Sequence, residues 1–295
     1  MPGFEGSFTL LVTPFDAEGR VDGRSLAALV DHHLRAGAQG LFAVCGTSEM
    51  AQLDAAERLA VAGAAVRSAG GAVPVIAAAN LEPDPAAQGD EVARMAATGV
   101  DGVVLVPPRS HGGDPGELEA YLATLAARSA VPVLLYEWPG SRPSEIPPSV
   151  YAHLVAHHGV VGIKDTRCTL EGIGAKIAAA PGGAVFQAHN PLLLAALELG
   201  ARGTMTITSA ARPDLLAALW RAHVAGQRED AVALERAIVA LDRAIGPCHP
   251  GGAKWMLQQA GVIANAGVRS GRLPDPSDLA RLRDWVGRAP AWRGA

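Results

Sequence analysis

The feature that most constrains the fold is a pair of segments repeated along the first two-thirds of the chain. A short apolar run rich in β-branched residues is followed by a longer Ala- and Leu-rich run with helical spacing. The short runs predict strands at Phe8–Val12, Gly40–Val44, Val73–Ala77, Gly102–Val106, Val131–Tyr136, Val160–Ile163, Ala184–Gln187 and Gly203–Ile207. The longer runs predict helices at Gly23–Ala36, Ala55–Ala69, Pro85–Thr98, Pro115–Ser129, Pro147–His157, Leu170–Ala179 and Pro191–Leu199. Because the short runs are continuously apolar, they are typical of parallel strands buried on both faces.

Eight strands that alternate with helices indicate an α/β protein, either a doubly wound sheet or a closed barrel. A doubly wound sheet usually has a glycine-rich phosphate turn after its first strand, but here that position holds Thr13-Pro14-Phe15-Asp16. The count of eight and the even spacing therefore predict a (β/α)8 TIM barrel over residues 1–211.

The pattern changes after the eighth predicted strand, where only helical segments follow. They span Asp214–Ala225, Arg228–Ile245, Gly252–Ala260 and Pro276–Gly287. We expect residues 212–295 to form a C-terminal helical extension that packs on the barrel.

Charge and cysteine content exclude several classes of protein. The net charge is −4, and no basic run is present, so we expect neither a nucleic-acid partner nor an anionic membrane. No uncharged stretch reaches 18 apolar residues, and the N-terminus lacks the regions of a signal peptide. The cysteines Cys45, Cys168 and Cys248 have no C-x-x-C spacing, which argues against disulfides or structural zinc and favours a reducing, cytoplasmic location.

Lys164 is the first candidate for chemistry, because active sites of such barrels lie at the C-terminal ends of the strands. It ends the sixth predicted strand and is one of three lysines, with Lys176 and Lys254. Apolar surroundings lower the pKa of a lysine, and the neutral amine can attack a carbonyl to form a Schiff base. The alternative is a lysine that snorkels at the strand end or pairs with Asp165.

Two neighbouring segments could assist such an amine. Tyr136 ends the fifth predicted strand, where its phenol could exchange protons with a carbonyl oxygen, although a packed tyrosine is the alternative. Gly46-Thr47-Ser48-Glu49 follows the second strand, and its small residues, N–H groups and hydroxyls suit a carboxylate. An ordinary turn is the alternative there.

Further candidates for substrate contact are Arg109 after the fourth strand, His189 after the seventh and Met205 in the eighth. His153 and His157 lie four residues apart on a predicted helix, but no third ligand is visible, so we predict no metal site. We expect His32-His33 at the surface.

These motifs, in this order, resemble the dihydrodipicolinate synthase / N-acetylneuraminate lyase family of class I aldolases over nearly the whole chain. Leu11-Val12-Thr13-Pro14-Phe15 is similar to the opening strand and turn of that family. Cys45-Gly46-Thr47-Ser48-Glu49 with Leu53 is similar to its G-T-T-G-E…L loop, and Tyr136-Glu137-Trp138-Pro139-Gly140 to its Y-N-x-P-G segment. Gly162-Ile163-Lys164-Asp165-Thr166 is similar to its G-x-K-D/E-x-[ST] segment.

The resemblance implies specific roles. Lys164 would form an imine with the C2 carbonyl of pyruvate or another 2-oxo acid, Tyr136 would shuttle protons, and Thr47 would hold the carboxylate or relay protons to Tyr136. Gly46, Ser48, Arg109, His189 and Met205 would contact substrate. The resemblance also implies no metal or organic cofactor, and a homo-oligomer, either a tetramer or a dimer.

The departures from the family pattern favour a member other than the strict synthase. Gly46 stands where the family loop has its first Thr, and residues 106–110 contain no tyrosine, although the synthase has one in that loop. The synthase also has an arginine five residues after the strand-five tyrosine. That position is Ser141 here, and Arg142 is one place further on. The leading hypothesis is an aldolase or hydro-lyase acting on a 2-oxo acid or a keto-deoxy sugar acid. The alternatives are a genuine 4-hydroxy-tetrahydrodipicolinate synthase, a non-catalytic 2-oxo-acid-binding protein and an unrelated phosphate-binding barrel.

Overall fold

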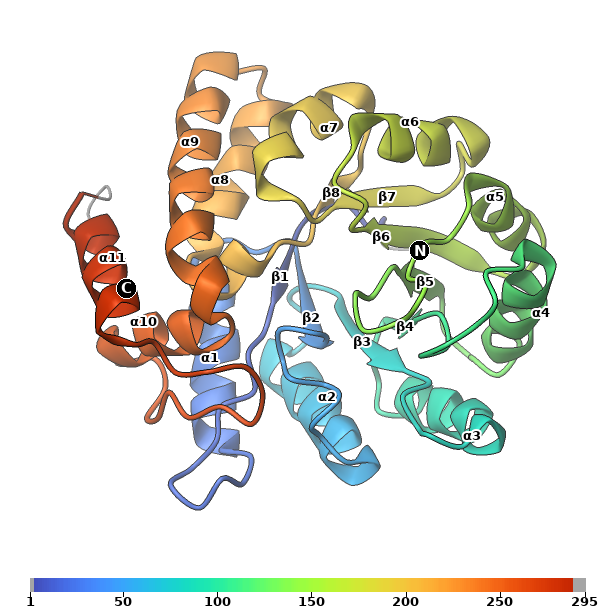
Figure 1. The fold of residues 1–295 in the computed structure, drawn as a ribbon, viewed down its shortest axis with the longest axis horizontal. Coiled ribbons are helices and arrows are strands. Elements are labelled where there is room, and N and C mark those ends of the chain that lie inside the picture. Colours follow the sequence, from blue (N-terminus) through green and yellow to red (C-terminus); the bar gives the residue numbers. More distant parts are fainter. Residues whose placement is uncertain (1–2, 289–295) are drawn as a thin grey trace.

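The computed structural model describes residues 3–288, in which eight parallel strands close into one barrel in chain order (Figure 1). The strands are β1 (Gly6–Leu10), β2 (Gly40–Val44), β3 (Val75–Ala79), β4 (Gly102–Leu105), β5 (Val133–Tyr136), β6 (Val160–Asp165), β7 (Ala184–Gln187) and β8 (Gly203–Thr204). The predicted (β/α)8 TIM barrel is confirmed. The last seven residues of the predicted extension lie outside the described residues.

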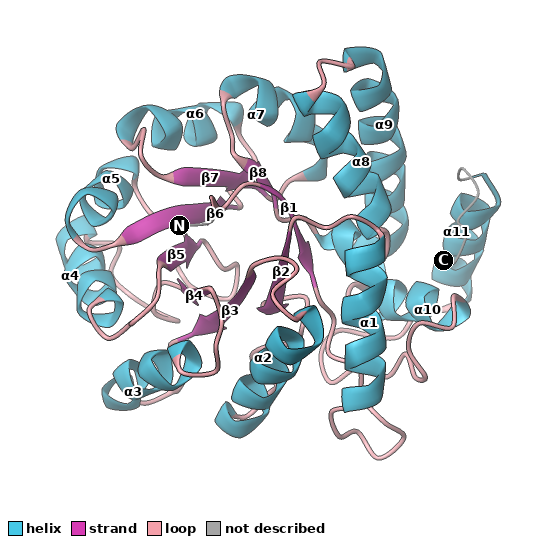
Figure 2. Cartoon of the chain, turned by 180° about the vertical axis from the view of Figure 1, so that it is seen from behind, coloured by secondary structure: helices cyan, strands magenta, loops and turns pink. Residues whose placement is uncertain are grey.

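Helices surround the barrel, as the view from behind in Figure 2 shows. They are α1 (Gly23–Arg35), α2 (Ala55–Ala69), α3 (Pro85–Ala96), α4 (Pro115–Ala126), α5 (Pro148–His157), α6 (Leu170–Ala179), α7 (Leu193–Leu199), α8 (Pro213–Val224), α9 (Arg228–Ile245), α10 (Gly251–Gln259) and α11 (Pro276–Arg288). Helix α8 packs on β1, α9 packs on α8, and α11 packs on α9. The division of the chain at residue 211 stays a prediction, since α8 contacts both the barrel and the extension.

The first four helices begin at aspartates that cap them. The carboxylates of Asp22, Asp54, Asp84 and Asp114 each accept hydrogen bonds from backbone N–H groups of the first turn. Such caps satisfy donors that have no partner within the helix. They fix where each helix starts and therefore the length of each loop at the catalytic end of the barrel.

Large apolar side chains fill the barrel interior. The rings of Phe8 and Phe186 meet edge to face with 5.3 Å between centroids. Gly40 makes room for them, because a Cβ there would lie 2.4 Å from the Phe8 ring. Alternate residues face the helices instead: Thr9 bonds His33 on α1, and Asp165 bonds Lys176 on α6. Lys164, adjacent to Asp165, therefore faces the interior.

Six of the eight strands (β1, β3, β4, β5, β6 and β8) differ from the predicted ranges by one to three residues at an end, and pairing explains the differences at β1 and β8. β1 begins two residues earlier than predicted, because Gly6 and Ser7 pair with β8. β8 is only two residues long, since the chain turns into a 3-10 helix at Ile207–Ala210. Ser209 holds that turn: its hydroxyl donates to the Thr206 carbonyl and accepts from the Leu10 N–H.

The expectation that His32 and His33 lie at the surface is wrong. They are 7% and 0% exposed, and the Nδ1 atom of His33 lies 2.8 Å from the Thr9 hydroxyl. Helix α1 turns His33 toward Thr9 of β1, and both histidines occupy buried positions that usually hold apolar side chains.

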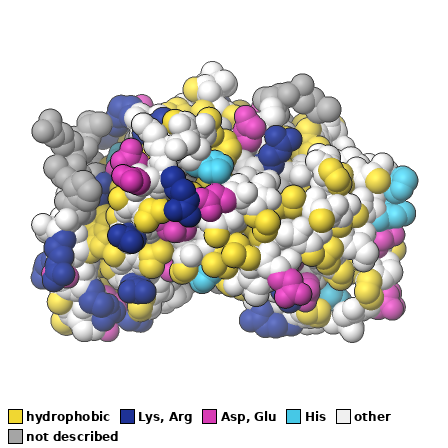
Figure 3. Space-filling view, turned by 90° about the horizontal axis from the view of Figure 1, so that it is seen from above, with side chains coloured by type: hydrophobic (Ala, Val, Ile, Leu, Met, Phe, Trp, Pro, Cys, Tyr) yellow, Lys and Arg dark blue, Asp and Glu magenta, His cyan; other side chains and the backbone are white. Residues whose placement is uncertain are grey.

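The surface carries charges of both signs. On the face shown in Figure 3, basic and acidic side chains are interspersed among apolar and uncharged ones. Within residues 3–288, no helix is both long and apolar enough to cross a membrane. No group of three His, Cys, Asp or Glu side chains in that range is placed to hold a metal ion.

Candidate active site

Lys164 and Tyr136 are paired residues of adjacent strands at the C-terminal end of the barrel. The Lys164 amine lies 4.4 Å from the centre of the Tyr136 ring and 5.6 Å from that of Phe42. Lys164 is 4% exposed, and its amine makes no hydrogen bond or ion pair with any residue between 3 and 288. The amine therefore sits among aromatic faces without a carboxylate counter-ion.

This environment changes the protonation of both groups. Burial lowers the pKa of Lys164 to about 8, with a smaller opposing effect from Cys45. Burial also raises the pKa of Tyr136, so its phenol stays protonated at neutral pH. At pH 7, roughly one Lys164 amine in ten is then neutral. The pair combines a nucleophilic amine with a proton donor.

The other two lysines show what a buried lysine with a partner looks like. Lys176 on α6 bonds Asp165 at 2.6 Å and Glu137 at 3.0 Å. Lys254 on α10 bonds Glu49 at 2.5 Å. Asp165 is thus occupied by Lys176, and the alternative in which Asp165 pairs with Lys164 is wrong.

Glu137 links the loops around the site. It stands at the Asn position of the family segment, is fully buried and accepts the backbone N–H groups of Ile146 and Thr166. The Thr166 hydroxyl donates to the Glu137 carbonyl at 2.5 Å. Glu137 is therefore a structural residue that joins the loop after β5 to the end of β6.

Gly46 brings the loop after β2 against Tyr136. A Cβ at position 46 would lie 3.2 Å from the Tyr136 phenol oxygen and 3.8 Å from Nε1 of Trp138. Such a contact is tighter than a side chain normally makes, so glycine lets the loop approach the phenol. Thr47 follows, is 3% exposed, and its hydroxyl lies 3.1 Å from Nε2 of His249.

Ser48 is buried, but its hydroxyl is used inside its own loop. It accepts the Cys45 N–H at 2.6 Å and lies 3.2 Å from the Cys45 sulfur. Its carbonyl accepts the Thr13 hydroxyl at 2.7 Å. The structure therefore gives Ser48 contacts that hold the turn, and its role in substrate contact stays a prediction.

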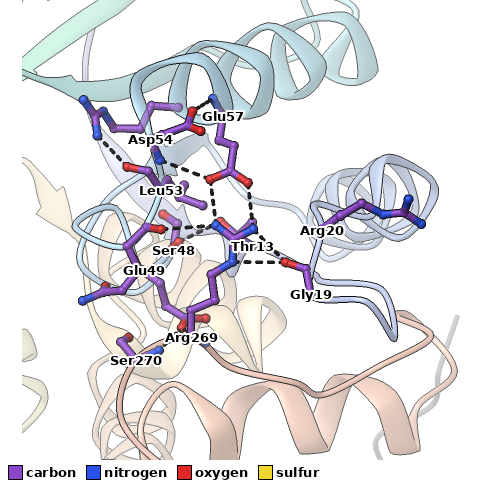
Figure 4. A network of polar contacts seen from close by, with 12 residues as sticks. Thr13, Gly19, Arg20, Ser48, Glu49, Leu53, Asp54, Glu57, Arg269 and Ser270 are labelled. Carbon is purple, nitrogen blue, oxygen red and sulfur yellow. Dashed lines mark hydrogen bonds and ion pairs between the residues drawn. The ribbon is translucent and has the colours of Figure 1, made fainter.

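Glu49 anchors the same loop to the C-terminal part of the chain (Figure 4). It adopts a left-handed backbone conformation with φ of 61°. Besides Lys254, its carboxylate accepts the backbone N–H groups of Arg269 at 2.6 Å and Ser270 at 2.5 Å. The Arg269 guanidinium bonds both carboxylate oxygens of Glu57 on α2. Segments more than 200 residues apart thus hold the loop that carries Thr47.

The remaining predicted contacts lie at strand ends, but none makes a hydrogen bond or ring contact with Lys164 or Tyr136. Arg109 is exposed, and its guanidinium lies 5.9 Å from the Trp138 ring centre beside a cavity of about 270 Å³. His189 is half-buried, with its N–H bonded to the Gln187 side chain. Met205 is buried, with its N–H bonded to the Gln187 carbonyl.

Sequence reasoning missed His249 because it lies between helices of the extension and not at a strand end. Burial, then the positive charges of Lys164 and Lys254, lower its pKa to about 4. The only signal in the sequence was a histidine before a proline, in the segment Gly246-Pro247-Cys248-His249-Pro250-Gly251-Gly252. Such a pattern is too common to single out a site residue.

Comparison with known proteins agrees with this geometry. The model of the Dihydrodipicolinate synthetase family matches residues 3–278. A protein of Hyphomonas neptunium named 4-hydroxy-tetrahydrodipicolinate synthase is 33% identical over 88% of this chain and 89% of its own. A protein of the same name from Stutzerimonas stutzeri is 30% identical over 90% of both chains.

Solved structures show the same fold. Dihydrodipicolinate synthase from Bacillus anthracis superposes with a TM-score of 0.92 at 24% identity, covering 98% of this chain and 100% of that one. A prophage protein of Escherichia coli K12, solved in complex with pyruvate, has a TM-score of 0.89 at 23% identity, covering 97% and 98%. Since the family model spans most of the sequence and the relatives match it nearly end to end, the chain belongs to the Dihydrodipicolinate synthetase family and is a lyase of that family.

Proposed function

We propose that the protein is a Schiff-base-forming lyase that uses pyruvate or a related 2-oxo acid. The observation that carries the proposal is the buried Lys164 amine, which has no counter-ion among residues 3–288 and lies over the Tyr136 ring. A purely structural buried lysine would be expected to resemble Lys176 and Lys254, each of which bonds a carboxylate. The family match supports the same chemistry.

The proposed reaction begins with attack of the neutral Lys164 amine on the C2 carbonyl of the 2-oxo acid. The carbinolamine loses water to give an imine, and Tyr136 passes the required protons to and from oxygen. The protonated imine accepts electrons, so an enamine can form at C3 when a C3–C4 bond breaks or a C3 proton leaves. In a hydro-lyase the electrons then expel a hydroxide, which leaves as water after protonation. Backbone N–H groups of the loop that carries Thr47 would bind the substrate carboxylate, and the Thr47 hydroxyl would relay protons to Tyr136.

We infer that the physiological substrate is a 2-oxo acid or a keto-deoxy sugar acid handled by an aldolase or hydro-lyase. Neither Ser141, which stands at the arginine position of the synthase, nor the following Arg142 reproduces the synthase pattern. Ser141 bonds the Pro107 carbonyl, and the Arg142 guanidinium bonds the carbonyls of Pro139 and Ser141. Arg109 remains the exposed cation beside Trp138 that an anionic substrate group could meet.

A genuine 4-hydroxy-tetrahydrodipicolinate synthase is the second candidate, because the reported relatives carry that name. Turnover of pyruvate with aspartate semialdehyde would support it, and turnover of a keto-deoxy sugar acid alone would support the first candidate. A non-catalytic binder needs neither an unpaired amine nor a phenol beside it. Assembly into a dimer or tetramer and a cytoplasmic location stay predictions.

The direct test is borohydride reduction in the presence of pyruvate, followed by peptide mass spectrometry. We expect one covalent adduct on Lys164, with none on the ion-paired Lys176 or Lys254, and none in Lys164→Arg. An intact protein without an adduct on Lys164 would refute Schiff-base chemistry.

A further inference from the structure

His249 reaches the active site from outside the barrel. It follows the short 3-10 helix Gly246–Cys248, between α9 and α10. Its Nε2 atom lies 3.1 Å from the Thr47 hydroxyl, although 202 residues separate the two in sequence. The C-terminal helices therefore place a ring nitrogen against the loop that also holds Gly46 and contacts Tyr136.

The surroundings of the ring decide which nitrogen carries the proton. Nδ1 is buried and has no hydrogen-bond partner among the described residues. A buried N–H without an acceptor is a costly arrangement, whereas a bare nitrogen lone pair costs less. The favoured tautomer is thus the one with its proton on Nε2, which donates to the Thr47 oxygen.

Burial, and then the positive charges nearby, keep this ring neutral. Lys164 and Lys254 both act on it, and Glu49 is already bonded to Lys254. A second positive charge next to the Lys164 amine is therefore disfavoured at neutral pH.

A donor on Nε2 turns the Thr47 proton away from His249. The Thr47 oxygen accepts from His249, so its own O–H is free to point elsewhere. No other hydrogen bond of the Thr47 side chain exists among residues 3–288. The adjacent Gly46 lies against the Tyr136 phenol oxygen, so the loop that carries Thr47 approaches that oxygen closely.

We propose that His249 is a positioning residue, which holds the Thr47 hydroxyl by a neutral Nε2–H so that Thr47 hands its proton toward Tyr136. The C-terminal extension thereby completes the proton path. This inference rests on the proposed function, because the path serves imine and enamine formation at Lys164. His249 acts through Thr47 and needs no contact with substrate.

Pyruvate alone can test the inference, since enamine formation exchanges its methyl hydrogens with solvent. The rate of deuterium exchange in D₂O, followed by proton NMR, requires no second substrate. We expect His249→Ala to lower the maximal exchange rate about 10- to 100-fold, because misplacement of a catalytic group has effects of this size. The pyruvate concentration that gives half the maximal rate should change little. His249→Gln retains an amide donor and should recover most of the rate, with the wild-type pH profile between pH 5 and 8.

A double-mutant cycle separates positioning from general loss of structure. In a Thr47→Val background, His249→Ala should cause no further loss of exchange, because the hydrogen-bond partner is already gone. The exposed His157 on α5 provides a matched control, and His157→Ala should exchange at the wild-type rate. Circular dichroism melting checks that each variant is folded.

The possible failures are distinguishable. If the wild type forms no borohydride adduct on Lys164, the proposed function and this inference both fail. If the adduct forms, the inference alone is overturned by an unchanged rate in His249→Ala, by additive losses in the double mutant, or by a His249→Gln variant as slow as His249→Ala.

Discussion

At the scale of single residues, Lys164 is distinguished by what its amine lacks. All three lysines of the chain are buried, yet only Lys164 has no carboxylate partner among the described residues. The strand pairing that sets Tyr136 beside it is a consequence of barrel register. One residue further along β6 the side chain faces α6, which is why Asp165 meets Lys176 instead.

The pH dependence of imine formation follows from this environment. Burial lowers the pKa of Lys164 to about 8, and only the neutral amine attacks a carbonyl. The rate of adduct formation with pyruvate should therefore rise about tenfold per pH unit below 8 and level off above it. Timed borohydride quenching between pH 6 and 10 measures this rate. A rate that keeps rising to pH 10 would mean that the amine behaves like an exposed lysine.

Residue-level expectations from the sequence were most reliable where strand position alone decided the outcome. Lys164, Tyr136 and Gly46 lie where the ends of β6, β5 and β2 were expected to meet. Ser48 shows the limit, because the direction of its hydroxyl depends on the turn around Cys45. The burial of His32 and His33 was missed because a polar side chain on a helix gives no sign of the face on which it packs.

At the scale of elements, the buried cluster of Lys176, Glu137 and Asp165 joins α6, the loop after β5 and β6. Two buried carboxylates share one buried ammonium. Removing the cation leaves buried negative charge without compensation, and such losses are much larger than those of exposed pairs.

Lys176→Met should therefore lower the free energy of unfolding by about 3–5 kcal/mol. Arg167→Met is the matched control, since Arg167 forms an ion pair with Glu145 in which both side chains are about two-fifths exposed. That change should cost at most about 1 kcal/mol. Urea denaturation of both variants at pH 7 compares them. Equal losses in the two variants would show that the buried cluster contributes no more to stability than the exposed ion pair.

The existence and order of the elements could be predicted from periodicity, but their ends could not. β8 shortens because Ser209 turns the chain back onto β1, and the helix expected from Pro191 starts at Leu193, after a 3-10 turn. The first change depends on a hydrogen bond between Leu10 and Ser209, which are 199 residues apart, and a local sequence pattern cannot detect such a contact.

At the scale of the whole molecule, the barrel and the C-terminal extension together build the active site. Glu49 bonds Lys254, Arg269 and Ser270, and Thr47 bonds His249. A helical extension on a barrel could be predicted from the change in pattern after β8. That it holds the loop after β2 could not, because each of these contacts spans more than 200 residues.

The buried histidines make the stability of the whole fold depend on pH. Burial lowers the pKa of His33 from 6.5 to about 3, and it lowers the pKa of His32 as well. Between pH 3 and 6.5 the unfolded chain binds a proton at His33 that the folded chain does not. The free energy of unfolding is thus unaffected by the protonation of His33 above pH 6.5, and it decreases as the pH falls from 6.5 toward 3.

For His33 alone, the free energy of unfolding should fall by about 2 kcal/mol between pH 7 and pH 5. His33→Gln keeps a group that can bond the Thr9 hydroxyl but does not titrate. Between pH 7 and pH 5, the free energy of unfolding of this variant, measured by urea denaturation, should therefore fall by about 2 kcal/mol less than that of the wild type. The exposed His157 has no such burial, and His157→Gln should follow the wild-type pH dependence. If His33→Gln and the wild type lose stability in parallel, the protonation of His33 does not control acid unfolding, and the carboxylates must account for it.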